Sequence, residues 1–218
     1  MDQYSQIVST IALSMGLAWA SGINLYAALL MLGVLGASGN MTLPPDLQVL
    51  TTPVVIVAAG VMYLLEFVAD KVPGVDSGWD ALHTFIRIPA GALLAAGAVG
   101  EVSPPLAVAA GIVGAGLAAG THTTKAGSRV LINTSPEPFS NWFASLGEDI
   151  AVVAGLWTAI HHPALFLVLL SLFVLLLVWL LPKLWAATKQ IFAYLGRLFR
   201  TKADMPPPAP KPPQPPND

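Results

Sequence analysis

The stretch from Pro163 to Pro182 contains no charged residue, and almost all of its side chains are apolar. A helix needs about 20 such residues to cross the hydrocarbon core of a bilayer. Across the whole chain only 10% of the residues are charged and the mean hydropathy is +0.70, whereas a soluble domain carries about 25% charged residues. Because so few charges cannot cover a water-exposed surface, the chain is predicted to be an integral membrane protein.

Six segments have the length and apolar character of membrane-spanning helices, which predicts an all-α membrane domain over residues 1–182. The predicted spans are Ile7–Leu35, Pro53–Asp70, Trp79–Val99, Pro104–Thr121, Phe139–Ile160 and Pro163–Leu181. The first is long enough to be tilted, or broken near Ser21–Asn24. Beyond the spans, residues 183–203 mix aromatic and basic side chains as an interfacial amphipathic helix does. Residues 204–218 are proline-rich and are expected to be a disordered tail.

Lysine and arginine outside the spans predict the orientation of the chain. With six crossings, the N-terminus, the loops 71–78 and 122–138 and the C-terminal tail share one face, and the loops on the other face carry no Lys or Arg. Basic loops stay in the cytoplasm, so both termini of a multi-pass membrane protein are predicted to be cytoplasmic. The expected partners are membrane lipids, a small solute or ion, and a second copy of the chain.

Some chemistries are excluded or disfavoured by composition. The net charge of −2 provides no basic field that would recruit nucleic acid. Cysteine is absent, which removes disulfides and thiolate metal sites. The sequence contains no phosphate-binding loop, nucleophile elbow or zinc-protease motif, so no cofactor and no metal are expected, and an enzyme is the less favoured class.

The two halves of the chain, residues 7–99 and 104–181, show a weak similarity. In each half a helix rich in small residues is followed by a proline and, thirteen residues later, by an acid, which is Glu66 in the first half and Asp149 in the second. Because each half has three helices, the second would be inverted, as in many secondary transporters whose sites lie between the halves. An inverted repeat is therefore predicted, with chance similarity as the alternative.

The richest polar pattern lies between the second and third predicted spans. Glu66 and Asp70 are four residues apart and share a helix face. After a proline–glycine break, Asp80, His83 and Arg87 form one narrow stripe on the next helix. A helical hairpin would turn this stripe toward the two acids.

Ionisable groups at the centre of a bilayer cost at least about 2.5–3.5 kcal/mol each. They persist when they are paired, when they line water, or when they act on a substrate. A carboxyl in this setting can exchange a proton or hold a cation, and Arg87 can neutralise an acid or grip an anion. Two structural alternatives remain, because Asp76 or Ser77 can cap the third helix and the stripe can be an internal ion pair that locks two helices.

A second cluster ends the fourth predicted span. Lys125 and Arg129 are four residues apart and could bind the phosphate of a lipid headgroup or solute, although ordinary anchoring on the cytoplasmic side is the alternative. His122 lies deeper in the span, where a hydrogen-bonded structural histidine is the usual case.

The fifth predicted span contains the adjacent acids Glu148 and Asp149. At least one of them has to avoid lipid, and the partners considered are Lys125, His122 and Asn24. A shorter span that leaves both acids at the membrane surface is the alternative.

Glycines recur along the fourth predicted span, at Gly111, Gly114, Gly116 and Gly120. Gly116 and Gly120 form a GxxxG pattern, which lets membrane helices approach closely. Tight helix packing is the expected consequence, and it implies no transport function.

The run from Ser21 to Ala27 and the run from Leu64 to Gly91 resemble a bacterial membrane-protein family that is catalogued as a domain of unknown function, number four-one-two-six. The resemblance extends over Ile7 to Leu181 and leaves the tail outside. It implies a multi-helix domain of a bacterial inner membrane, and it supplies no activity, substrate or catalytic residues.

Three functions remain as hypotheses. The first is a small secondary transporter or channel-like protein, with coupling to protons as one option. Its substrate or ion pathway would contain Glu66, Asp70, Asp80, His83, Arg87, Glu148 and Asp149. The second is a membrane-embedded enzyme or lipid-phosphate-handling protein that uses Lys125, Arg129 and Arg87. The third is a structural or assembly protein that recruits a partner through its C-terminal region.

Overall fold

The computed structural model describes residues 3–72, 74–100, 103–134 and 138–200, and its regular structure in this part of the chain is entirely helical. The helices are α1 (Gln3–Ala37), the short 3-10 helix η1 (Pro45–Thr51), α2 (Pro53–Ala69), α3 (Val75–Val99), α4 (Pro104–Ile132), α5 (Pro138–His161) and α6 (Pro163–Arg200). Five of them are long and apolar enough to cross a membrane, or six if η1 and α2, which are bent by 70°, count as one span. The prediction of an all-helical structure is therefore confirmed, and its long apolar helices are candidate membrane spans. The proline-rich tail lies outside the described residues.

Helix α1 lies at the centre of the bundle and contacts every other helix. Its backbone is broken at Asn24, where φ is −143° and ψ is 94°. Up to Ile23 the chain runs along α3, because the Ser14 hydroxyl donates to the Ala95 carbonyl at 2.8 Å and the Ser21 hydroxyl donates to the Arg87 carbonyl at 2.7 Å. The first half of α1 thus runs from the end of α3 toward the middle of α3.

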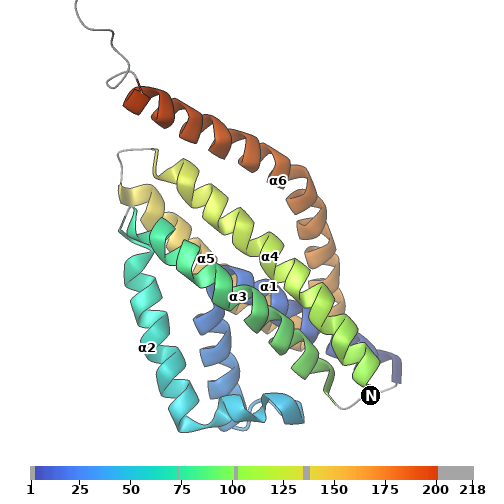
Figure 1. Ribbon diagram of the computed structural model, residues 1–218. Helices are drawn as coiled ribbons and strands as arrows, with labels where there is room; N and C mark the ends of the chain where they lie inside the picture. Colours follow the sequence, from blue (N-terminus) through green and yellow to red (C-terminus); the bar gives the residue numbers. More distant parts are fainter. Residues whose placement is uncertain (1–2, 73, 101–102, 135–137, 201–218) are drawn as a thin grey trace, which may run out of the picture.

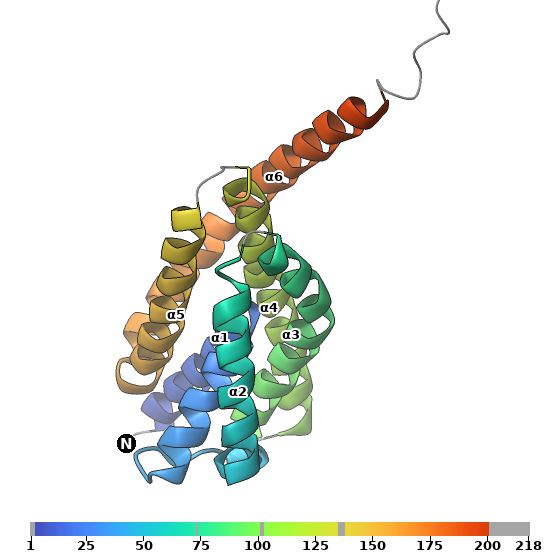
Figure 2. The ribbon, with the colours of Figure 1, turned by 90° about the vertical axis from the view of Figure 1, so that its left-hand side faces the viewer.

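The second half of α1 returns along α2. Leu30 faces Gly60, and Gly33 faces Ile56, so this half approaches the beginning of α2 as it descends. Leu47 of η1 then packs against Gly97 near the end of α3. Helix α1 is therefore a helical hairpin, with its tip beside the middle of α3 and both of its ends at one end of the bundle (Figures 1 and 2).

The predicted break near Ser21–Asn24 is confirmed, but the expectation that this segment passes once through the bundle is corrected. Near the chain start, Tyr4 and Ser9 line a groove with His161 and Pro163, which connect α5 to α6. The end of α6 lies at the opposite end of the bundle (Figure 2). The start of α1 and the end of α6 therefore lie at opposite ends of the bundle (Figure 2), whereas six simple crossings would place them at the same end.

Small residues bring α1, α3 and α4 together. A Cβ atom added at Gly114 of α4 would collide with Ala95 of α3, and one added at Gly22 of α1 would collide with Thr121 of α4. The predicted GxxxG pair behaves differently, because a Cβ atom added at Gly116 would meet no other group within 4 Å and one added at Gly120 would meet Leu177 of α6. The close approach thus depends on Gly114 rather than on the GxxxG pattern.

Helix α6 continues through Pro182 to Arg200, so the predicted amphipathic segment is, up to Arg200, an extension of the last span. This extension leans away from the bundle (Figure 2). Its Lys183 ammonium lies 3.0 Å from the Trp179 ring centre, while Trp185 and Phe192 are exposed. A helix with exposed aromatic and basic side chains is typical of the membrane interface.

A matched pair of substitutions in α4 tests the packing of the bundle. We expect Gly114→Ala to lower the free energy of unfolding by about 1–3 kcal/mol, because overpacking forces neighbouring helices apart. Gly116→Ala places its methyl group in open space and should leave stability unchanged or slightly raised. Denaturant unfolding in detergent micelles measures both, and equal stability of the two variants would contradict this packing.

Candidate functional site

Charged side chains from α2, α3, α4 and α5 form a continuous set of buried ion pairs beside the tip of α1. We call this set the ion network; its members are Glu66, Asp70, Asp80, Arg87, Lys125, Arg129 and Glu148. All except Glu148 have side chains that are 4% exposed or less. Since a lone charge in hydrocarbon is expensive, the members hold one another inside the bundle.

Arg87 of α3 joins the acids of two helices. Its guanidinium forms an ion pair with Glu66 of α2 and lies 3.1 Å from Asp80 on its own helix. Gly74, with a φ of 85°, supports the sharp turn between α2 and α3, because glycine adopts this conformation without steric cost. Helices α2 and α3 thus form the predicted helical hairpin, with charged side chains of the two helices facing each other.

Lys125 of α4 is the most connected cation of the ion network. Its ammonium lies within 4 Å of four carboxylates, at 2.8 Å from Asp70, 3.3 Å from Glu148, 3.4 Å from Glu66 and 3.8 Å from Asp80. One turn further along α4, Arg129 bonds Glu148 at 2.7 Å and also donates to the Asn141 carbonyl at 3.0 Å. The predicted phosphate-binding pair is therefore occupied by carboxylates of the same chain.

Charged side chains bind the tip of α1 at two places, where the first half of the hairpin ends and where the second half begins. The Lys125 ammonium donates to the Ile23 carbonyl at 3.2 Å, where the first half of the hairpin ends. The second half begins at Asn24, whose side-chain oxygen accepts from the Ala27 amide at 2.9 Å and whose amide donates to Asp149 at 2.8 Å. A cation at a helix C-terminus and an anion at an N-terminus both favour the helix dipole.

Two histidines lie beside the ion network, and one of them, His122, contacts Arg87. Arg87 donates to Nδ1 of His122, so the other ring nitrogen of this neutral imidazole carries the proton and donates to the Thr84 hydroxyl at 2.7 Å. Thr84 in turn donates to the Asp80 carbonyl at 3.0 Å. The structural role considered for His122 is the one the geometry supports, because the chain of bonds fixes the position of Arg87.

His83 lies at the edge of the ion network. It stacks on Trp79 with ring centres 4.4 Å apart, and its Nε2 lies 3.1 Å from the Tyr26 hydroxyl. Among the described residues, no three His, Asp or Glu side chains are arranged to hold a metal ion.

Asp76 lies in the first turn of α3 and is not part of the ion network. One of its oxygens accepts from the backbone amides of Gly74 at 2.9 Å and of Ser77 at 2.6 Å. The side chain of Asn133 donates to both of its oxygens. The N-cap of α3 is Gly74, so the prediction that Asp76 or Ser77 is the N-cap is wrong, and Asp76 serves instead as an acceptor within the first turn.

The structure brings most of the predicted site residues together and adds three that the sequence analysis did not name. Glu148 bonds Lys125 and Asp149 bonds Asn24, which are two of the partners considered. Thr84, Tyr26 and Asn141 were missed. The only available signal for them was a polar side chain within an apolar helix, and such side chains usually bond within their own helix.

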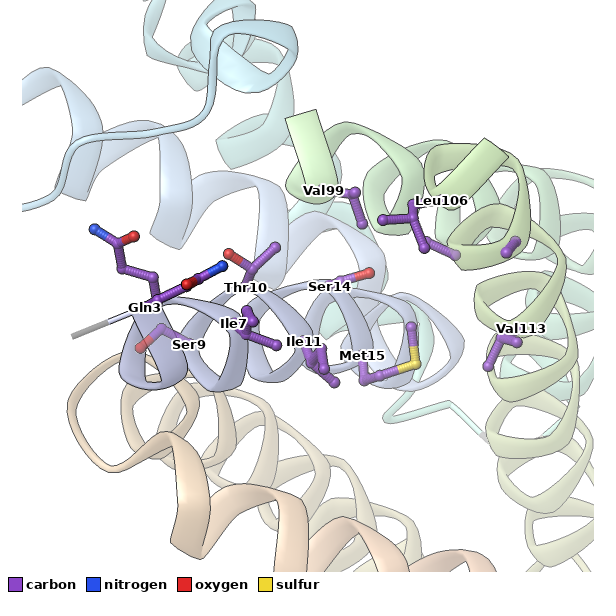
Figure 3. A pocket seen from close by; sticks show the side chains of 13 residues that line it. Gln3, Ile7, Ser9, Thr10, Ile11, Ser14, Met15, Val99, Leu106 and Val113 are labelled. Carbon is purple, nitrogen blue, oxygen red and sulfur yellow. The ribbon is translucent and has the colours of Figure 1, made fainter. Parts of the chain in front are cut away.

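A separate groove of about 770 Å³ lies between the first turns of α1 and the facing ends of α3 and α4. Figure 3 shows Ile7, Ile11 and Met15 of α1 across from Leu106 and Val113 of α4. Its lining residues carry no charge and include no member of the ion network.

The charge pairing around Arg87 yields a stability prediction. Arg87→Met should lower the free energy of unfolding by about 3–5 kcal/mol, since it leaves Glu66 and Asp80 buried without their cation. Lys189→Met, which removes an exposed cation of α6, should change it by less than about 0.5 kcal/mol. Chemical denaturation in micelles provides the comparison, and similar losses for the two variants would show that the pairing does not stabilise the fold.

Comparison with known proteins gives a family and no function. No curated protein and no solved structure matches the chain. Residues 11–183 match the family described as "Domain of unknown function (DUF4126)", a range close to the one over which the sequence resembled that family. The chain, with its hairpin α1 and its ion network, therefore belongs to the DUF4126 family.

Proposed function

We propose that this protein is a small secondary transporter of a solute or ion, and that the ion network is the part of it that responds to the substrate. The observation that carries the proposal is the position of the ion network, buried among four helices and bonded to the broken tip of α1. Charged residues inside membrane helices typically mark substrate or ion pathways.

The hairpin form of α1 supports this proposal. Non-helical backbone at membrane depth is tolerated where protein or water satisfies its polar groups, and at Asn24 the neighbouring side chains do so. Transporters use such helix breaks to present helix ends and free carbonyls to substrates and coupling ions. A purely structural bundle would gain nothing from the break, since an unbroken helix satisfies its own backbone.

The geometry around Lys125 supplies a means of changing state. Four carboxylates on three elements surround one ammonium at distances between 2.8 and 3.8 Å. A small helix movement would exchange one partner for another without leaving the ammonium unpaired, so the barrier to rearrangement is low for a buried charge. Two packings of similar energy are what alternating access needs.

Access to the ion network is proposed to run along α5. Glu148 is its most exposed member, with an 18% exposed side chain. The neighbouring Asp149 borders a surface groove of about 490 Å³ that follows α5 to Thr158. A solute arriving there would meet Asp149 first and Lys125 next.

The orientation in the membrane is also part of the proposal. Lys71 follows the end of α2, and Lys183 and Lys189 belong to the part of α6 that extends from the same end of the bundle (Figure 2). We therefore place this end in the cytoplasm of a bacterial cell. The hairpin α1 then enters from the opposite side. The proposal does not require the inverted repeat. Helix α4 is unbroken whereas α1 is a hairpin, so the first helices of the two halves differ in shape.

A phosphate-handling function receives less support from the same geometry. Lys125 and Arg129 are almost fully buried, and both are paired with carboxylates. A phosphate group would have to displace those acids and would meet their repulsion.

The transport proposal is tested with proteoliposomes on a solid-supported membrane. A jump in H⁺, Na⁺, K⁺, Cl⁻ or phosphate should give a transient current with the unaltered protein for at least one of these ions. We expect Glu66→Gln and Asp149→Asn to abolish this current while the variants remain folded. Asp46→Asn, which changes an exposed carboxylate in the same way, should keep it. Currents no larger than those of empty liposomes, or full currents from both pathway variants, would refute the assignment.

A further inference from the structure

We propose that the ion network binds one exchangeable proton, held by the Glu66 and Asp80 carboxylates that share Arg87. This inference deepens the transport proposal and rests on it for its purpose, because it names the proton as the coupling ion or the cargo. The proton binding itself can be measured without any transport.

The first argument is the charge balance of the ion network. Its ion pairs include four carboxylates, from Glu66, Asp70, Asp80 and Glu148, and three cations, from Arg87, Lys125 and Arg129. One negative charge is left without a counterpart. A buried charge without compensation is strongly disfavoured, and a carboxylate in this position neutralises itself by taking up a proton.

The second argument concerns carboxylate oxygens that receive no hydrogen bond. Glu66 is 0% exposed and Asp80 is 1% exposed, yet Oε2 of Glu66 and both oxygens of Asp80 accept no hydrogen bond from any residue that the structure describes. Asp80 contacts Arg87 only as an ion pair at 3.1 Å. Oxygens that are buried and lack donors are the atoms on which a proton adds most readily.

The titratable and charged groups that face this carboxylate pair come from α1, α2, α3, α4 and α5, and those nearest Glu66 include Tyr26 of α1 and Tyr63 of α2. Arg87 and His83 lie on the same helix as Asp80, while α4 contributes Lys125, Arg129 and His122. Asp70 of α2 and Glu148 of α5 complete the ring. The acids of this ring are not arranged as a metal site within the described residues. A proton needs no such coordination shell.

Uptake and release follow from the same geometry. On uptake, an O–H bond forms on Glu66 or Asp80, and the remaining charges of the ion network balance. On release, the proton leaves toward Glu148, whose carboxylate reaches solvent and lies 3.3 Å from the Lys125 ammonium. Lys125 can then move closer to the carboxylate that has regained its charge. Protonation thus selects which acid Lys125 pairs with, and no other reactant is needed.

Infrared difference spectroscopy of the purified protein in lipid nanodiscs tests the proton site directly. At neutral pH the unaltered protein should show the C=O stretching band of one protonated carboxylic acid, and the band should disappear at alkaline pH. Asp80→Asn and Glu66→Gln each remove the unmatched acid, so both should lose this band. Asp46→Asn, a matched change at an exposed carboxylate, should keep it.

The melting temperature, measured as a function of pH, gives a second test. It uses the unaltered protein, so it does not depend on whether a variant folds. The folded state holds a proton that the unfolded chain gives up, so the melting temperature of the unaltered protein should fall as the pH rises above neutrality. Asp80→Asn should flatten this dependence. Combining Glu66→Gln with Asp80→Asn leaves Arg87 without an acid, and this double variant should lose far more thermal stability than the two single variants added together.

The outcomes separate this inference from the transport proposal. A titrating band without any transient current supports the proton site and rejects transport. A current without a band rejects the proton site and leaves transport standing. A band that persists in both single variants, or a melting temperature that depends on Na⁺ and not on pH, would show that the unmatched charge is balanced in another way.

Discussion

The cost of a charge inside a membrane governs this structure more than any other interaction. Arg87 and Lys125 are buried at depths where neither could remain alone, so α2, α3, α4 and α5 each bring an acid or a base to the same place. The resulting ion pairs bind helices that otherwise share little contact, since α2 packs mainly on α1. Small residues bring only α1, α3 and α4 into close contact. The ion pairs also connect α2 and α5 to these helices.

The hairpin in α1 and the ion network depend on each other. A helix that ends in the middle of a membrane exposes carbonyl and amide groups that hydrocarbon cannot satisfy. Lys125 binds the end of the first half, and Asn24 with Asp149 binds the start of the second. The same charges therefore stabilise the break and are held in place by it. A substrate or proton that altered the pairing would act on the tip of α1 directly, which connects chemistry at the ion network with movement of a helix.

Several features followed from the sequence because they depend on neighbours along the chain. Apolar stretches predicted the helices. The spacing of three or four residues between Glu66 and Asp70, and along Asp76, Asp80, His83 and Arg87, predicted faces that meet across a short turn. The break near Asn24 was also predicted. Its consequence was not, because a single non-helical residue is compatible with either a kink or a reversal of direction. Only the contacts of Leu30 with Gly60 and of Ser14 with Ala95 show that the chain turns back.

By itself, the sequence determined that this protein belongs in a bilayer, which segments are helical, and that its ionisable residues need partners, because hydropathy and helical periodicity are local properties. The tertiary structure decided which partners they found. It paired Lys125 and Arg129 with carboxylates, so these cations are not free to bind phosphate. It placed the close contact between α3 and α4 at Gly114 rather than at Gly116. It also brought four acids together with three bases. These outcomes depend on how helices distant in sequence rotate and cross, and the spacing of residues along one helix carries no information about that.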